Sequence, residues 1–187
     1  MARNSTRDMT EGSPMKLILE FSIPLLLGFL CQQFYSVVDT VIVGQFLGVR
    51  ALAGVGATGS VNFMVIGFCT GVCSGFAIPV AQKFGAKDYH GMREFVANGA
   101  CLAGVIALIM TVLVTLLCRN ILTWMQTPED IFENAYSYIL IIFWGIPATF
   151  LYNILSGIIR SMGDSKTPLA FLLLSSGLNI GLDVLCI

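Results

Sequence analysis

The amino-acid sequence predicts an all-α, polytopic membrane protein. The chain has 187 residues, of which 56% are hydrophobic and 11% charged, whereas soluble domains carry about 25% charged residues. Its mean hydropathy is +0.84, and long apolar runs alternate with short polar segments. The formal net charge is only -1, so nothing points to nucleic acid as a partner. These observations exclude an ordinary soluble enzyme and a disordered tail, and they make the lipid bilayer the expected partner.

Five apolar segments are long enough to cross a bilayer, because a membrane-spanning helix needs about 20 residues. The polar residues 1–16 are expected to form a cytoplasmic segment, and residues 17–187 one transmembrane unit. The first apolar run is longer than the core of a signal peptide, which has about 7–15 residues, so we expect it to be retained. A polar loop is expected over residues 81–94. The predicted helices cover residues 17–46, 51–80, 95–117, 128–159 and 168–187.

Proline and glycine predict local geometry in two of these segments. Pro147 follows Gly145 inside the fourth segment and should kink it, because proline removes a backbone hydrogen bond and clashes with the preceding turn. Gly67, Gly71 and Gly75 recur at every fourth position of the second segment. Such a stripe allows a second helix to approach closely, so we expect it to be a packing face. A sliding surface for a moving helix is the alternative.

The basic residues predict the orientation of the chain. If the five segments all span the membrane, eight of the ten Lys and Arg residues fall on the side of the N-terminus. Cytoplasmic loops carry the basic excess, so the N-terminus is expected in the cytoplasm and the protein in the plasma membrane. The larger set comprises Arg3, Arg7, Lys16, Lys83, Lys87, Arg93, Arg160 and Lys166, and the smaller set comprises Arg50 and Arg119.

Two acidic residues in the first and fifth segments are the main candidates for a functional site. A carboxylate at the centre of a membrane helix costs about 2.5–3.5 kcal/mol on insertion scales, which favours a functional interpretation. Gln32, Tyr35 and Asp39 share one helical face, and Asn179 stacks on Asp183 one turn away. Such groups bind Na⁺ through oxygen atoms or hold a proton on a desolvated carboxyl. Alternatively, Asp39 lies at a helix end and Asp183 makes a structural bond between helices.

The cysteines and the single histidine do not suggest a metal centre. The cysteines are scattered singly through apolar runs, and His90 lies in a polar segment. A zinc site needs clustered ligands at set spacings, so we expect buried thiols and no cofactor besides a coupling ion. The six cysteines are Cys31, Cys69, Cys73, Cys101, Cys118 and Cys186.

Four stretches of the sequence resemble the multidrug and toxic compound extrusion (MATE) transporters. Residues 22–27 read SIPLLL and residues 32–40 read QQFYSVVDT. Residues 82–88 read QKFGAKD, and residues 154–168 read ILSGIIRSMGDSKTP. The resemblance covers nearly the whole chain, from about Pro14 to Ile187, and also includes Asn179 and Asp183.

The resemblance implies a fold, an activity and a site. MATE transporters have twelve spans in two lobes around a central cavity, and they exchange entering Na⁺ or H⁺ for cationic or amphipathic compounds. This chain matches helices one to five. The sixth helix and the C-terminal lobe would be missing, which agrees with a chain that is still apolar at Ile187 and is expected to be truncated. The family pattern assigns the coupling cation to Asp39, Asn179 and Asp183, and bending of the first helix to Pro24.

Other roles and other functions stay open at this point. Gln33, Tyr35 and Tyr152 are candidates for lining the cavity, where aromatic rings meet cationic drugs, although aromatic residues also pack or face lipid. A flippase for lipid precursors from the same superfamily is one alternative, but the expected spans contain acids and no Lys or Arg. An intramembrane aspartyl protease is the other. The sequence around Asp39 and Asp183 lacks the expected Tyr-Asp and paired glycines, so an enzyme is not expected.

Overall fold

A computed structural model describes residues 12–186, with the backbone alone for Asp183, Val184 and Cys186. The part of the chain so described is helical and contains no strand, which confirms the all-α class. The elements are α1 (Pro14–Ile42), the π-helix η1 (Val43–Leu47), α2 (Val49–Gly85), α3 (Tyr89–Trp124), α4 (Glu129–Trp144), α5 (Ile146–Ser161) and α6 (Lys166–Cys186).

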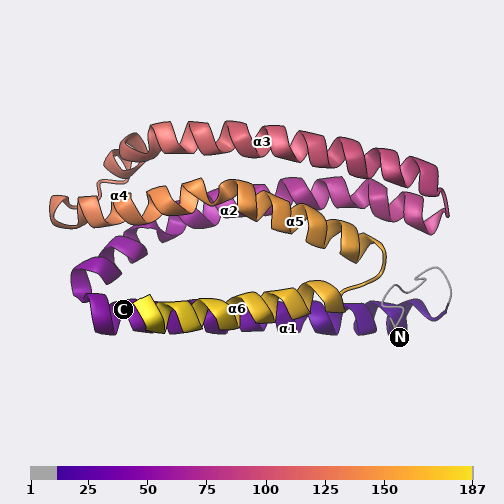
Figure 1. The fold of residues 1–187 in the computed structure, drawn as a ribbon, viewed down its shortest axis with the longest axis horizontal. Helices are drawn as coiled ribbons and strands as arrows, with labels where there is room; N and C mark the ends of the chain where they lie inside the picture. The colour runs from indigo at the N-terminus through magenta and orange to yellow at the C-terminus, as the bar shows by residue number, and fades with distance from the viewer. Residues whose placement is uncertain (1–11, 187) are drawn as a thin grey trace.

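The helices run back and forth between two ends of the bundle (Figure 1). The start of α1 and the turns at residues 86–88 and 162–165 lie at one end, and Gly48 and the turn at residues 125–128 lie at the other. Consequently α1 and α6 run in the same direction, and they pack side by side. Helices α2 to α5 form a second group of mutually packed helices.

Several helices have the length and composition of membrane spans. Among the described residues, three pass this test, namely Pro14–Leu47, Val49–Gly85 and Tyr89–Trp124. Helices α4 and α5 make a fourth span if the bent pair is counted as one. The predicted fifth span corresponds to α6, which has 21 residues. The expected number of five spans therefore stays a prediction.

The core lies between α2, α3, α4 and α5. Ile139 and Phe143 of α4 are fully buried against it, and so are Cys69 of α2 and Leu122 of α3. The buried positions of α4 recur every four residues, which places them on one face of the helix. Large apolar side chains on the outside stay exposed, for example Leu116 at 76%. Apolar faces of this extent on long helices fit a lipid environment.

The predicted kink at Pro147 is present, and it divides the segment into two helices. Helix α4 ends at Trp144, and α5 continues at an angle of 44°. The Gly145 N–H donates to the carbonyls of Ile141 and Ile142 at 3.1 and 2.9 Å. Pro147 lies in the first turn of α5, where a missing N–H costs nothing. Starting a new helix thus avoids the clash that proline causes inside a continuous one.

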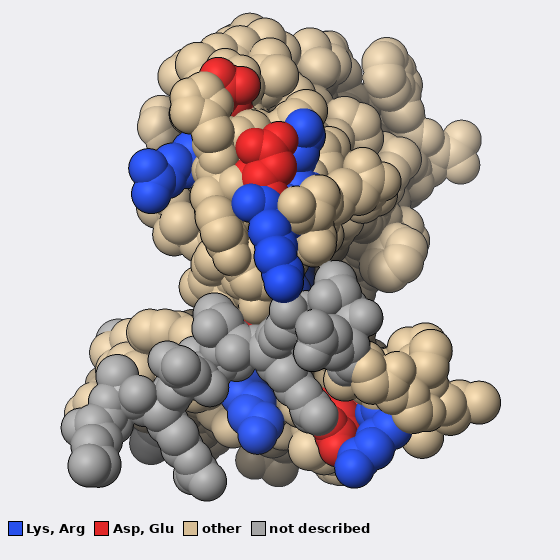
Figure 2. Space-filling view, turned by 90° about the vertical axis from the view of Figure 1, so that its right-hand side faces the viewer, with Lys and Arg blue, Asp and Glu red and all other residues tan. Residues whose placement is uncertain are grey.

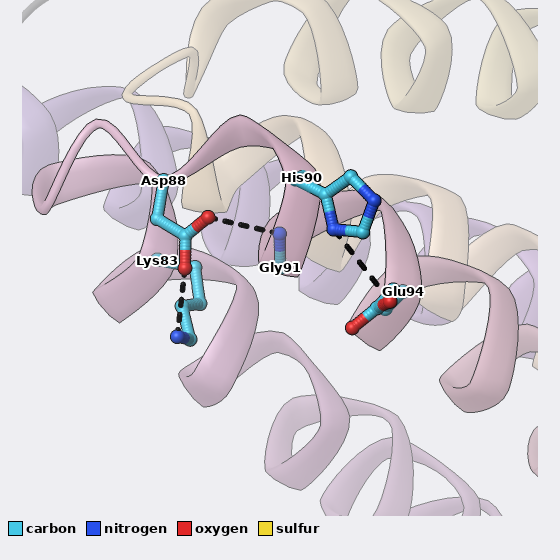
Figure 3. A network of polar contacts seen from close by, with 5 residues as sticks. All are labelled: Lys83, Asp88, His90, Gly91 and Glu94. Carbon is cyan, nitrogen blue, oxygen red and sulfur yellow. Dashed lines mark hydrogen bonds and ion pairs between the residues drawn. The ribbon is translucent and has the colours of Figure 1, made fainter.

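The expected polar loop over residues 81–94 is wrong, because only residues 86–88 separate α2 from α3. Charged side chains here lie on helix ends (Figure 3). Asp88 caps α3 by accepting from the Gly91 N–H at 3.0 Å, and it also accepts from Lys83 Nζ at 2.8 Å. His90 and Glu94 lie 3.6 Å apart one turn further on. The cap on α3 and the bond from Lys83 fix the short turn between the two helices.

Helix α3 also extends past its predicted end at residue 117, as far as Trp124. Arg119 lies inside this extension, and its Nη2 donates to Glu133 Oε1 of α4 at 3.0 Å. The guanidinium also lies 5.1 Å from the ring centre of Tyr136. Arginine is a good helix former, and with these partners Arg119 lies within α3 instead of ending it.

Lysine and arginine gather at one end of the molecule. Figure 2 looks onto the end where the start of α1 and the turns at residues 86–88 and 162–165 lie. Arg50 and Arg119 occupy α2 and α3 near the opposite end. The asymmetry predicted from the sequence is therefore present in space within the described residues. The residues at the basic end are Lys16, Lys83, Lys87, Arg93, Arg160 and Lys166.

The glycine stripe of α2 does not pack against another described helix. A Cβ added at Gly67, Gly71 or Gly75 would meet no heavy atom within 4 Å. The buried face of α2 instead runs through residues such as Val65 and Cys69. Gly67 follows Val65 by two residues, or about 200° around the helix, so the stripe lies on the opposite face. The expected packing role finds no support within residues 12–186.

Substitution of Gly54 is expected to destabilise the bundle. A Cβ at this position would lie 3.1 Å from the backbone nitrogen of Ala135, so Gly54→Leu forces α2 and α4 apart. Overpacking of this kind costs about 1–3 kcal/mol. Thermal unfolding of the purified protein in detergent measures the loss. Gly71→Leu is the matched control and should leave the unfolding temperature nearly unchanged. An equal loss for both variants would contradict this account of the two helix faces.

Removal of the Lys83 ammonium is expected to raise the pKa of Asp88. The hydrogen bond from Lys83 and the bond from the Gly91 N–H hold the pKa of this carboxyl below its ordinary value. The stabilisation is therefore present above the unfolded-state pKa and is lost as the pH falls through the lowered, folded-state pKa. A carboxyl titration by NMR in Lys83→Met measures the change. Lys87→Met is the control, and an equal shift in both variants would assign the effect to net charge.

Candidate functional site

The pairing of α1 with α6 creates the candidate site. Pro24 and Gly28 are buried on α1. A Cβ added at Gly28 would lie 3.5 Å from a methyl of Leu169 and 3.6 Å from one of Leu172. These are ordinary van der Waals distances, so leucine side chains of α6 pack against α1 at Gly28. The sequence alone left open whether these two segments touch, and the structure shows that they do.

A polar bond joins the two helices within their apolar sequences. Asn179 Nδ2 of α6 donates to the Tyr35 hydroxyl of α1 at 2.7 Å. Tyr35 is half-buried, whereas Asn179 is exposed. Both residues were predicted to face a polar site, and the structure brings them into contact. The bond leaves the second amide hydrogen and the oxygen of Asn179 available for further contacts.

Asp39 lies one turn beyond Tyr35 on α1 and is also half-buried. Its carboxylate interacts electrostatically with the hydroxyl of Tyr138, a half-buried residue of α4. The sequence analysis did not single out Tyr138. The available signal was a tyrosine inside an apolar segment, but nothing in the sequence indicates which helix that tyrosine faces. Gln32, which shares the predicted stripe, is exposed.

The Asp183 side chain lies outside the described residues, so its predicted role as a ligand is not placed by the structure. Its backbone belongs to α6, four residues after Asn179. Because α1 and α6 run in the same direction, one further turn from the Tyr35–Asn179 contact brings residues 39 and 183 to a similar level.

The other predicted site residues are placed without being brought together. Gln33 is exposed on α1, and Tyr152 is 40% exposed on α5. Two shallow apolar grooves of about 470 and 450 Å³ lie on α6 and α3, and neither includes these residues or Tyr35. Helix α1 continues without interruption through Pro24. The cavity-lining roles and the hinge roles of Pro24 and Pro147 therefore stay predictions.

Long apolar helices, a basic end and a polar bond between two of the helices define a polytopic helical membrane protein. The model of the MatE family matches residues 24–185, so the chain belongs to this family.

Relatives with curated names and a solved structure agree with this membership. The protein named "Probable multidrug resistance protein YoeA", from Bacillus subtilis, is 31% identical over 177 residues, which cover 95% of this chain and 38% of the relative. YpnP of the same organism, also named a probable multidrug resistance protein, is 30% identical over 172 residues, which cover 92% of this chain and 39% of the relative. The structure of a MOP superfamily transporter from Pyrococcus furiosus has a TM-score of 0.87 at 27% identity, and the match covers 94% of this chain and 39% of that structure. The chain thus spans about two fifths of the length of each of these proteins.

The bond between Tyr35 and Asn179 is expected to contribute measurably to stability. Double-mutant cycles on polar bonds between membrane helices average about 0.6 kcal/mol, with a maximum of about 1.7 kcal/mol. A cycle of Tyr35→Phe and Asn179→Leu, measured by unfolding in detergent, should give a coupling in this range. Tyr152→Phe with Asn179→Leu is the control cycle and should give additive effects. Additivity in both cycles would mean that the bond contributes no net stability.

Proposed function

We propose that this chain forms part of a cation-coupled antiporter that exports cationic or amphipathic compounds. Membership of the MatE family and two relatives named as multidrug resistance proteins support multidrug efflux. The chain covers about two fifths of these relatives. Its helices would therefore contribute one portion of the transport path, and a sixth helix and a second lobe the rest. Membership of this family favours a transporter over an enzyme.

The observation that carries the proposal is the polar contact between α1 and α6. Tyr35 and Asn179 meet inside apolar helices, and Asp39 lies one turn away. With Asp183 at a similar level on α6, these residues would supply carboxylate and amide oxygens to one cation. Oxygen donors suit Na⁺, and a desolvated carboxyl pair suits a shared proton. We therefore assign the coupling ion, Na⁺ or H⁺, to Asp39, Asn179 and Asp183.

The basic end supports an orientation. Six described lysines and arginines lie at the end where α1 begins, against two towards the other. The positive-inside rule places that end in the cytoplasm, and we propose the plasma membrane as the location. The coupling ion would then enter from the opposite, extracellular side, close to the end of the bundle towards which Asp39 lies on α1.

Coupling requires that the ion prefers one conformation over the other. Bound charge at Asp39 and Asp183 would remove the repulsion between two carboxylates at one level of adjacent helices. The α1–α6 pair would tighten on ion binding and loosen on release. Bending of α1 at Pro24, where a backbone hydrogen bond is missing, would pass this change to the drug site.

Neutralising both carboxylates is expected to slow coupled efflux strongly. Asp39→Asn with Asp183→Asn, introduced into the intact protein that carries these residues, should lower the initial rate of ethidium export about tenfold or more, because a loss of a few kcal/mol of ion binding gives at least this factor. Export is measured in cells by fluorescence. Replacing Na⁺ with choline, or collapsing the pH gradient, identifies the ion.

Asp130→Asn provides a matched control, because this residue is exposed in the first turn of α4. It should export ethidium at the original rate. Full activity of the double variant would remove the proposed cation site, and the absence of ethidium export from the original protein would point to a different cargo.

A further inference from the structure

The turn between α5 and α6 buries a charged residue that the proposed transport function does not use. Asp164 and its neighbour Ser165 are each only 4% exposed. Burial of a carboxylate is costly unless several hydrogen bonds satisfy it. The turn belongs to the stretch RSMGDSKTP at residues 160–168, which is the most specific part of the family resemblance.

Asp164 fixes the first turn of α6. Its Oδ1 accepts from the N–H groups of Lys166 and Thr167, both at 3.0 Å. Its Oδ2 accepts from the Thr167 hydroxyl at 2.6 Å. The positive end of the helix dipole also stabilises a carboxylate in this position. Three bonds from one side chain therefore determine where α6 starts and in which direction it points.

The same turn is tied to the helix group α2–α5. The Ser161 hydroxyl at the end of α5 donates to the Ala77 carbonyl of α2 at 2.8 Å. A Cβ at Gly157 would come within 3.2 Å of the Ala77 Cβ, so α5 and α2 are in close contact here. Gly163 adopts a φ of 82°, which lets the chain reverse within four residues. The turn that leads into α6 thus leaves a well-packed part of the bundle.

The direction of α6 at its start determines the position of Asn179 further along the helix. Asn179 lies thirteen residues after Lys166, or about 20 Å along the axis at 1.5 Å per residue. A tilt of about 5° at the start of α6 would displace Asn179 by almost 2 Å at this distance. Hydrogen bonds extend over a range of only about 0.5 Å. The bond from Asn179 to Tyr35 therefore depends on a well-defined start of the helix.

We propose that Asp164 is a positioning residue for the ion site, because its capping bonds hold α6 at the angle at which Asn179 reaches Tyr35. The effect on transport rests on the proposed function, whereas the effect on helix position does not. Loss of the cap should displace Asn179 from Tyr35 and weaken ion binding, with little effect on the packing of α2 to α5.

The experiment measures helix position directly, in the intact protein with its native cysteines replaced by serine. Tyr35→Cys and Asn179→Cys are joined by a short dithiol-reactive cross-linker in membranes. Asp164→Ala should lower the cross-linked fraction about threefold or more, since loss of a cap typically costs about 1 kcal/mol. Asp164→Asn keeps Oδ1 for the two backbone N–H groups and should restore most of the yield.

Asp88→Ala is the matched control, because Asp88 caps α3 at the same end of the bundle. It should leave the cross-linked fraction unchanged. In a second measurement without the added cysteines, Asp164→Ala should raise the half-saturating concentration of the coupling ion about threefold or more, with a smaller change in maximal rate. A general folding defect would instead lower the maximal rate.

Each outcome decides the proposal. An unchanged cross-linked fraction in Asp164→Ala, or an equal fall in Asp88→Ala, would overturn it. A fall in Asp164→Ala that Asp164→Asn reverses would support it, even if the original protein exports no ethidium. In that case the positioning role would stand and the proposed transport function would fail.

Discussion

In hydrocarbon a polar group has no water to bind, so the protein has to supply its partner. This constraint applies to the polar groups that lie within the long apolar helices. Asn179 donates to Tyr35 across two helices. The Thr111 hydroxyl returns to the Ala107 carbonyl of its own helix at 2.7 Å. The few polar residues inside the bundle are therefore also the residues that determine how its helices are placed.

The same environment removes the usual reason for helices to associate, since lipid tails are as apolar as leucine. Close contact then depends on small residues at the points where backbones approach. Gly54 allows α4 to approach α2, and Gly157 brings α5 close to Ala77 of α2. The glycines at positions 67, 71 and 75 also follow the small-residue spacing, but no neighbouring helix among the described residues lies against them. The spacing of small residues therefore identifies a possible contact face, but it does not identify the helix that packs there.

The sequence predicts the class, the alternating direction of the helices and the break before Pro147, because each depends on composition or on local chemistry. It fails at helix ends such as residues 81–94, where charged residues suggest a loop, although Lys83 at the end of α2 donates to Asp88 in a turn of only three residues. The sequence also does not indicate the electrostatic interaction between Asp39 and Tyr138. That interaction depends on how α4 is rotated, which the period of a single segment does not determine.

The two groups of helices differ in what holds them. Helices α2 to α5 share a close-packed core around Phe143 and Phe150, whose contacts are numerous and insensitive to charge. The pair α1–α6 combines apolar contacts with the bond between Tyr35 and Asn179, beside the carboxylate of Asp39. Such bonds contribute about 1 kcal/mol or less between membrane helices, and the balance between the two helices is therefore sensitive to whether the half-buried carboxyl of Asp39 is charged. The proposed coupling ion, bound beside this bond, would therefore shift α6 relative to α1 while the core stays intact, provided that the start of α6 is held in place.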